Sequence, residues 1–532
     1  MKPAIERMDL GMEELKQLLE RAREVLSEED YRKLKAAVDT LGYLTELVAD
    51  KETTIRHLRQ LLLPRTEKTS TVLGKSEGEP TAQTQGEPAG QPDASKPKQP
   101  GHGRNGANAF EGARKVKVVH EQLKPGDRCP ECPNGKVYAQ KEPKTLVRIV
   151  GQAPMAATVY ELDRLRCNLC GSVFTAQAPE GVGPEKYDES AGAMIAQLKY
   201  GSGMPFYRQQ ELERGLGIPL PAATQWEIVE EAAEVIKPAR DELIRQAAQG
   251  EVMHNDDTSM KILRLKREPD DERTGVFTSG IVSTRQGQKI ALFFTGRQHA
   301  GENLAEVLRR RAAELRPPIQ MCDALSRNAP KLAGGVEILL AHCLAHGRRQ
   351  FVEVAGNFPS ECRHVLVMLG EVYRHDGQAR EQGMTPQERL RFHQEQSGPV
   401  MDELHRWLEE QFSERKAEPN SGLGKAITYL LRHWRALTTF LREPGAPLDN
   451  NLCERALKKA VLHRKNALFY RTLNGAQVGD LFMTLIHTCE LCGVHSFDYV
   501  TELQRHAREL EANPAAWMPW NYRDTLVRGK DA

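Results

Sequence analysis

The segment at residues 448–469 reads LDNNLCERALKKAVLHRKNALF, and the rest of the chain can be organised around it. Pro447 precedes two polar residues, Asp449 and Asn450, and either of them is a favourable helix N-cap. In a helix that begins here, one face carries small or apolar side chains that can pack on a core, namely Leu452, Ala456 and Ala460. The segment is therefore predicted to be an amphipathic helix.

Charge is unevenly distributed along this predicted helix. Glu454 lies one turn in, on a face that it shares with Asn451 and Lys458. Basic residues then follow with no acid among them: Arg455, Lys458, Lys459, Arg464, Lys465 and Arg471. One carboxylate beside a cationic surface is typical of a metal-binding acid at a place where phosphates bind. A solvated basic helix with a single acid is the alternative.

The same segment resembles the last catalytic block of the insertion sequence 66 family of bacterial transposases, which are of the acid-triad (DDE) type. That block has an Asn-Asn pair before Glu-Arg, and a later Arg-Lys-Asn before an aromatic residue. The matching residues here are Asn450, Asn451, Glu454, Arg455, Arg464, Lys465, Asn466 and Phe469. The resemblance implies two further acids and a DNA-binding apparatus upstream.

Length and composition set outer limits. A chain of 532 residues allows about three or four domains, and its net charge of +1 means that any DNA contact must come from local clusters. Ten cysteines in a chain of this length do not indicate a secreted disulfide scaffold. Neither a signal peptide nor an apolar run of about 18 residues is present. We expect a cytoplasmic, nucleoid-associated bacterial protein with no membrane contact.

The N-terminal region, 1–63, has a helical pattern with an apolar heptad at Leu34, Leu41, Val48, Ile55 and Leu62. This pattern predicts a coiled coil and a homo-oligomer, with a helical hairpin within one chain as the alternative. Residues 64–110 lose apolar content, which predicts a flexible linker.

Two cysteine pairs follow in the region 111–180, and they read Cys129-Pro-Glu-Cys132 and Cys167-Asn-Leu-Cys170. Four thiolates at this spacing suit one structural Zn²⁺, and the alternating sequence between the pairs predicts the short strands of a zinc ribbon. A redox role would need a thioredoxin-like context, which the sequence lacks. A third pair, Cys489 and Cys492, lies in an apolar helical run and is interpreted as core.

The region 181–250 has helical periodicity. The helix around Arg208, a turn at 217–219 and a second helix from Ala222 have the rhythm of a helix-turn-helix, for which a plain helical hairpin is the alternative.

From residue 251 the period changes. Three consecutive strands, EVMHNDDTSMKIL, GVFTSGIVS and KIALFFTG, precede a helix at 301–315, the strands PIQMCDA and VEILLAH, and a helix at 348–355. This order predicts an RNase H-like catalytic domain over 251–490, with a helical insertion at about 359–443 and a C-terminal element at 491–532. The whole chain is thus expected to be a multidomain α/β protein.

RNase H-like folds place one acid in the middle of the first strand and another at the end of the fourth. Asp256 or Asp257 fits the first position and Asp323 the second. Strand alternation does not choose within the pair, but Asp-Asp-Thr at 256–258 resembles the family's Asp-acid-Thr, which selects Asp256. By resemblance, Asp256 would bridge two Mg²⁺ (or Mn²⁺) ions, Asp323 would hold one and Glu454 the other.

Cys343-Leu-Ala-His346, followed by Arg348 and Arg349, resembles the family's Cys-x-x-His block with its Arg pair. We interpret His346 and Asn451 as supporting residues. The predicted DNA contacts are Arg208, Arg348, Arg349, Arg455, Lys458, Arg464 and Lys465. Residues 324–326 depart from the family, which tends to have a small residue and an aromatic after the second acid.

Together these features predict a transposase that binds the terminal inverted repeats of an insertion sequence and target DNA, and that catalyses metal-dependent strand cleavage and strand transfer. Accessory proteins of the element are possible further partners. An RNase H-like nuclease without strand transfer, and a non-catalytic DNA-binding protein derived from a transposase, are the alternatives.

Overall fold

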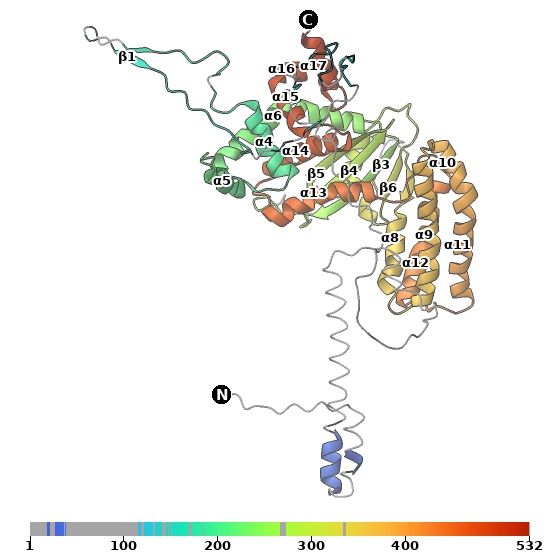
Figure 1. Cartoon of the computed structure of the whole chain (residues 1–532). Helices are drawn as coiled ribbons and strands as arrows, with labels where there is room; N and C mark the ends of the chain where they lie inside the picture. Colours follow the sequence, from blue (N-terminus) through green and yellow to red (C-terminus); the bar gives the residue numbers. More distant parts are fainter. Residues whose placement is uncertain are drawn as a thin grey trace, which may run out of the picture. The chain divides into compact units, whose positions relative to one another are not determined.

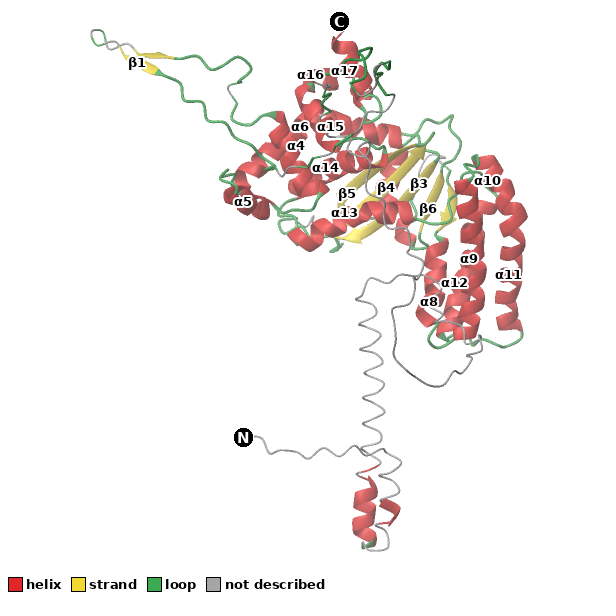
Figure 2. Ribbon diagram, viewed as in Figure 1, coloured by secondary structure: helices red, strands yellow, loops and turns green. Residues whose placement is uncertain are grey.

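The computed structural model describes most of the chain beyond residue 114 and short pieces before it (Figures 1 and 2). The described residues are 19–21, 27–36, 38, 115–118, 122–130, 134–140, 145–146, 148–149, 152–166, 168, 170, 173–183, 185–266, 273–332 and 337–530. Several predictions fall outside them, on the linker 64–110, on Leu41, Val48, Ile55 and Leu62 of the heptad, and on Cys132 and Cys167.

The chain divides into two units, which are described separately. The larger unit consists of Gly78–Ala345 and His433–Ala532, and it contains a five-stranded sheet. The second unit consists of Met1–Glu77 and His346–Arg432, and long helices dominate its described part. The chain passes from one unit to the other in the first turn of helix α8 (Leu344–Val354).

The sheet of the larger unit is mixed, with the spatial order β5-β4-β3-β6-β7 (Figure 2). Strands β3, β4 and β5 pair antiparallel, whereas β6 runs parallel to β3 and β7 parallel to β6. Their bounds, in chain order, are Val252–Ser259, Phe277–Arg285, Gln288–Gly296, Ile319–Cys322 and Leu339–His342. Strand β3, which comes first of these five in the chain, is therefore the middle strand of the sheet.

Different helices cover the two faces of β3 and β4. Helix α13 (Asn451–Ala467) lies against Gly280 of β4, whose carbonyl accepts a 3.2 Å hydrogen bond from the Cys453 thiol. Helix α7 (Ala300–Leu308) lies against the preceding residue, Ser279, whose hydroxyl accepts from the Asn303 amide at 2.9 Å. Adjacent strand residues point to opposite faces, so α13 and α7 sit on opposite sides of the sheet.

Helix α14 (Leu473–Leu491) closes the outer edge of the sheet at β5. Three of its side chains, one turn apart, accept from alternate backbone N–H groups of the strand: Asp480 from Thr295 at 2.6 Å, Thr484 from Phe293 at 3.1 Å and Thr488 from Ala291 at 3.1 Å. The match is geometric, because four helical residues rise about 6 Å and two strand residues advance about 6.6 Å.

The remaining helices of the larger unit pack around α6 (Ala222–Ala247), which buries Val229, Ile236 and Leu243 at a spacing of seven residues. Before it come α4 (Glu189–Ala196), the π-helix η2 (Gln197–Gly201) and α5 (Phe206–Gly215). The C-terminal element consists of α15 (Ser496–Arg505), α16 (Ala507–Ala512), the 3₁₀ helix η6 (Pro514–Trp517) and α17 (Tyr522–Lys530).

The second unit is built from α9 (Pro359–Glu381), α10 (Pro386–Phe392), the π-helix η4 (His393–Ser397), α11 (Gly398–Ser413) and α12 (Gly422–Leu437), with most of α8. Asp376 ties this unit together by accepting from Arg380, Arg389 and His393. Burial opposes ionisation of Asp376, but the His393 hydrogen bond and the Arg389 charge hold its pKa well below the usual range.

One predicted helix is too long. The sequence pattern predicts a helix over 301–315, but α7 ends at Leu308. The Arg311 guanidinium instead donates to the carbonyl oxygens of Ala248 (2.9 Å) and Gly250 (2.8 Å) beyond the end of α6. Pro317 and Pro318 then prevent any continuation of helix into β6.

Candidate active site

Asp256 and Asp257 are adjacent on β3 and therefore point to opposite faces of the sheet. Asp257 lies on the α7 side, where it accepts from the ring of His299 at 2.9 Å and pairs with Arg327 at 3.4 Å. Asp256 pairs with Gly280 across the sheet and so lies on the α13 side. The register of the sheet thus shows which of the two acids faces α13, a choice that strand alternation alone could not make.

Asp323 follows the last residue of β6 and lies beside Asp256. The amide nitrogen of Asn328 donates to Oδ1 of both carboxylates, to Asp256 at 3.3 Å and to Asp323 in a shorter contact. Two carboxylates therefore share one neutral donor. Asp256 also accepts from the backbone N–H of Asp257 at 2.8 Å.

A buried polar network holds Asn328 in place. Its backbone carbonyl accepts from the Asn255 side chain at 2.9 Å and from the Gln320 side chain at 2.7 Å. The Gln320 amide also donates to Asn255 at 2.8 Å. All three residues are at most 1% exposed, so the short 3₁₀ turn η3 (Ser326–Asn328) is fixed against the sheet.

The environment of Asp256 disfavours its charged form. Burial is the main cause and the neighbouring Asp323 charge adds to it, whereas the hydrogen bonds from Asp257 and Asn328 oppose them; the net effect raises the pKa of Asp256 to about 6. Close like charges of this kind are relieved by a cation.

Glu454 is on the first turn of α13, which packs against Gly280, the residue that pairs with Asp256 across the sheet. Gly280 makes this approach possible, because a Cβ there would lie 3.0 Å from the Leu457 side chain and 3.4 Å from the Cys453 sulfur. Cys453 precedes Glu454 on this turn. Burial raises the pKa of its thiol well above the usual value, and the charges of Asp256 and Glu454 raise it further.

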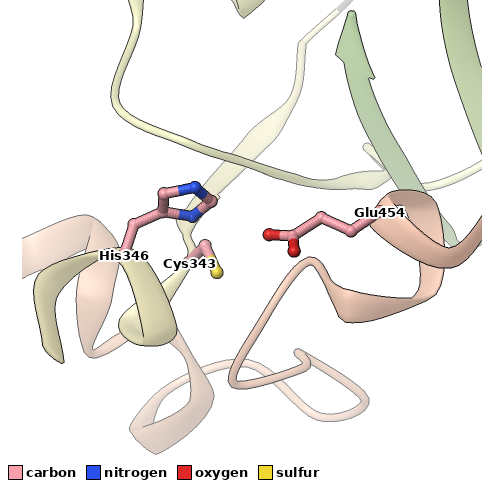
Figure 3. A group of neighbouring side chains, drawn as sticks. All are labelled: Cys343, His346 and Glu454. Carbon is pink, nitrogen blue, oxygen red and sulfur yellow. The ribbon is translucent and has the colours of Figure 1, made fainter. Parts of the chain in front are cut away.

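The Glu454 carboxylate also faces a cysteine and a histidine. Potential ligand atoms of Cys343, His346 and Glu454 all lie within 4.8 Å of one another (Figure 3). Among the described residues, these three side chains form the group of His, Cys, Asp or Glu residues that are close enough to hold one ion. Asp256 and Asp323 do not belong to this group.

Asn450 joins the start of α13 to the sheet. It is fully buried, its amide donates to the Asn255 carbonyl at 3.1 Å, and its Oδ1 contacts the His254 ring at 3.1 Å. Its backbone N–H donates to the sulfur of Cys343 at 3.2 Å. The sequence singled out Asn451 as the supporting residue, but Asn451 is exposed, and Asn450 makes the buried contacts.

Some of the basic residues predicted to contact DNA are exposed on α13, and others are bonded within the protein. Arg455, Lys458 and Lys465 are exposed on α13, as a DNA contact requires. Lys459 instead pairs with Glu490 at 2.7 Å. The Arg464 guanidinium donates to Thr258 Oγ1 at 3.0 Å and to Ser259 Oγ at 2.8 Å, so it anchors α13 to the end of β3.

The other predicted DNA contacts lie elsewhere. Arg208 is exposed on α5, while Arg348 is buried and Arg349 half-buried in α8. A buried guanidinium is a poor candidate for a phosphate contact on the protein surface. Cys489 is buried in α14 and Cys492 half-buried at its C-cap, in keeping with the prediction that this pair belongs to the core.

Cys129 and Cys170, one residue of each predicted zinc-binding pair, lie in short hairpins. Cys129 follows an antiparallel bridge between Arg128 and Lys136, and its N–H donates to the Gly135 carbonyl at 2.9 Å. Cys170 lies in sequence between the antiparallel strands β1 (Arg164–Arg166) and β2 (Val173–Thr175).

The sequence did not predict the buried contacts of Asn328 and Asn450. Asn450 was noticed as a helix cap and as part of the Asn-Asn pair, so a signal existed. Asn328 follows Asp323 by five residues in a polar loop, and nothing in that sequence distinguishes it from a solvated turn residue.

Among the described residues, no helix is both long enough and apolar enough to cross a membrane. The family model described as "Transposase IS66 family" matches residues 186–478, which is more than half of the chain. It spans the sheet, α13, and the helices on both sides of them.

Three similar proteins of Sinorhizobium fredii are described as uncharacterized. The protein y4jD is 26% identical over 422 residues, which cover 76% of this chain and 80% of y4jD. The protein y4hP is 25% identical over 420 residues, covering 75% of this chain and 74% of y4hP. The protein y4qI is 26% identical over 356 residues, covering 63% and 62%. With its family domain matched from α4 into α14, the chain belongs to the IS66 family of transposases.

Proposed function

We propose that this protein is a DDE-type transposase that binds the ends of an insertion sequence and catalyses metal-dependent DNA strand cleavage and strand transfer. One observation carries the proposal: Asp256 and Asp323 converge on a single donor, Asn328, and Asp256 pairs with Gly280, against which the first turn of α13 packs. Membership of a transposase family makes DNA the expected substrate. The order of strands, with β3 in the middle, supports an RNase H-like core.

The acids suit a divalent cation. Asp256 and Asp323 place two carboxylates on one neutral amide, and burial with the Asp323 charge already raises the pKa of Asp256 to about 6. Carboxylate oxygens are the ligands that Mg²⁺ prefers. We assign Asp256, Asp323 and Glu454 as the residues that would hold the ions, with His346 as a neighbour of Glu454.

When bound, two Mg²⁺ (or Mn²⁺) ions supply charge stabilisation and an activated hydroxyl for phosphoryl transfer. The chain's own residues perform the remaining tasks. Asn328 keeps the two aspartates together, Asn450 fixes the start of α13 to the sheet, and Arg464 fixes its other half to the end of β3. Exposed Arg455, Lys458 and Lys465 would contact the phosphates of the bound DNA.

Cleavage and joining assays with candidate element ends and Mg²⁺ test the proposal. Wild-type protein should produce both nicked and strand-transfer products, whereas Glu454→Gln should produce neither and still bind DNA. If cleavage occurs and no joined product forms, the nuclease alternative holds. If DNA is bound and never cut, the protein is a binding protein derived from a transposase.

We also propose that Cys129, Cys132, Cys167 and Cys170 hold one structural Zn²⁺, supported by the hairpin positions of Cys129 and Cys170. Elemental analysis of wild type and Cys129→Ser tests this, with Cys489→Ser as the matched control. Equal zinc content in wild type and Cys129→Ser would contradict it.

A further inference from the structure

A cavity of about 760 Å³ lies beside the C-terminal end of α13. Its walls come from η2, from the first turns of α6, from the loop after α13 and from Arg264, which follows β3. This volume falls within the usual range of small-molecule sites, about 300–1,000 Å³. All of these segments belong to the larger unit.

The walls combine aromatic rings with positive charge. Trp226 is half-buried and Phe469 is 38% exposed, so each presents part of a ring to the cavity. Arg264 and Arg471 also line it and are exposed. Flat aromatic faces stack with nucleobases, and guanidinium groups bind phosphate oxygens.

Lys199 is the buried cation of this cavity. It is 8% exposed, and its ammonium lies 4.8 Å from the centre of the Phe206 ring. Within the described part of the chain, this ammonium has neither an ion pair nor a hydrogen bond, and burial lowers its pKa to about 8. A buried charge without an acidic partner is costly, and an anion entering the cavity would offset that cost.

Acidic side chains are also present, and they narrow the choice of ligand. Glu227 and Glu230 line the cavity on α6, and Glu230 accepts from the Asn474 amide. Two carboxylates disfavour a ligand made only of phosphates. They suit a ligand with donor groups, such as the amino group of a base.

The cavity is rigidly connected to the acid site. Beyond β3, Ile262 forms an isolated parallel bridge with Tyr470 in the loop after α13. Around it, Tyr470 N–H donates to Lys261 O at 2.8 Å, and Arg264 N–H donates to Arg471 O at 3.0 Å. From Glu454 to the end of α13 is about 20 Å, or about six nucleotide steps of a duplex. The exposed Lys458 and Lys465 lie along the same helix face as Glu454.

We propose that this cavity binds one unpaired nucleotide of the DNA, about six nucleotide steps from the phosphate that is cut. Its base would stack on Trp226 and Phe469, and its phosphates would contact Lys199, Arg264 and Arg471. This inference rests on the proposed DNA-processing function, because it assumes that DNA runs along α13 from the acids.

Binding of the full-length protein to two labelled duplexes of equal sequence tests the proposal, one blunt and one with a short single-stranded 3′ overhang. Fluorescence anisotropy gives the ratio of the two dissociation constants. Wild type should prefer the overhang by about tenfold, since one base stacked on an aromatic ring contributes on that scale. Trp226→Ala and Phe469→Ala should each reduce the preference several-fold.

Leu468→Ala is the matched control. Leu468 precedes Phe469 and is 66% exposed, and it is not among the residues that line the cavity. The preference for the overhang should survive this change. Trp226→Phe keeps an aromatic ring and should retain most of the preference, which guards against misfolding of the alanine variant.

The cation is tested with Lys199→Met, which keeps the apolar stem over Phe206. The salt dependence of overhang binding should fall by about one unit and that of blunt binding should not change. Lys186→Met is the control, because Lys186 lies 5.2 Å from the Tyr187 ring in a similar pair that is not part of the cavity.

An overhang with abasic nucleotides completes the test. Loss of the bases and Trp226→Ala should weaken binding by the same factor, and combining them should add little. Equal binding of blunt and overhang duplexes by wild type would overturn the cavity proposal alone. Absence of binding to either duplex would overturn the proposed function. Binding of a free nucleotide with no overhang preference would assign the cavity to a small molecule and reject the DNA ligand.

Discussion

Asp256 and Asp480 have similar pKa values in very different surroundings. Burial is the main cause that raises the pKa of each to about 6. At the outer edge of the sheet, Asp480 accepts from the backbone N–H and the hydroxyl of Thr295, both at 2.6 Å, and Arg240 adds favourable charge. At the centre, Asp256 faces a second carboxylate, Asp323, across one amide.

The comparison shows that a raised carboxyl pKa does not by itself mark an active site. Fixed protein donors satisfy both oxygens of Asp480, so its role is structural. The charge of Asp256 is opposed by Asp323, and an external cation is the group that relieves such a pair. The like charge beside the acid is therefore the informative feature.

The largest expected effect concerns activity. Asp256→Asn should reduce DNA cleavage by about a thousandfold or more, because the group that binds the cation is lost. Asp480→Asn should leave cleavage within about threefold of wild type at equal folded concentration. Gel assays with Mg²⁺ measure both rates. If the two variants lose activity equally, the distinction between the two acids is wrong.

The second effect concerns the pH dependence of stability. The folded state binds a proton at Asp480 more tightly than the unfolded state, since burial raises the pKa of this carboxyl from 3.8 to about 6. The wild-type free energy of unfolding should therefore fall as pH rises from about 4 to 6, and the loss should then stay constant above pH 6. In urea unfolding, the free energy of unfolding of Asp480→Asn relative to that of wild type should increase by about 2–3 kcal/mol as pH rises from about 4 to 7. The gain should be independent of Mg²⁺.

The same titration at Asp256 should respond to Mg²⁺, because a cation favours the ionised carboxylate. A gain for Asp256→Asn in the absence of metal should shrink or reverse when Mg²⁺ is added. A gain for Asp480→Asn that also varied with Mg²⁺ would remove the contrast between the two sites.

A tenfold effect is expected for Asn328. Asn328→Ala removes the shared donor, so Mg²⁺ should have to be about tenfold more concentrated for half-maximal cleavage. Metal titration of the cleavage rate measures this. Gln320→Ala, which removes one of the two donors to the Asn328 carbonyl, should have a smaller effect in the same direction.

The smallest effect separates two neighbouring basic residues. Lys465 is exposed, so Lys465→Ala should lower the salt dependence of DNA binding by about one unit. Arg464 is held by Thr258 and Ser259, so Arg464→Ala should change the salt dependence less and lower the melting temperature more. Equal salt slopes for both variants would mean that Arg464 also contacts phosphates.

Periodicity and turn signals predicted much of the fold. The strands of the sheet, the start of α13 after Asn450, and the placement of an acid pair within β3 and of Asp323 just after β6 follow from patterns that span a few residues. Glu454 was found through a motif resemblance. The length of α7 was overestimated because its end depends on the distant contacts of Arg311.

The rest could not be predicted because it depends on tertiary contacts. Asn328 is held by Asn255, which is 73 residues away on β3, and by Gln320 on β6. The choice of Asp256 over Asp257 came from a motif resemblance and not from strand periodicity, because it depends on Gly280, which lets α13 cover one face. Arg464 was assigned to DNA from its charge, whereas its partners are the hydroxyl groups at the end of β3.

The contact of α14 with the edge of the sheet has a consequence for how the protein opens and associates. An outer strand with unsatisfied N–H groups is a template for another strand, but Ala291, Phe293 and Thr295 already donate to helix side chains. A second copy of the chain cannot extend the sheet there unless α14 first detaches. The hydrogen-exchange rates of these three amides would therefore report the detachment of a single helix.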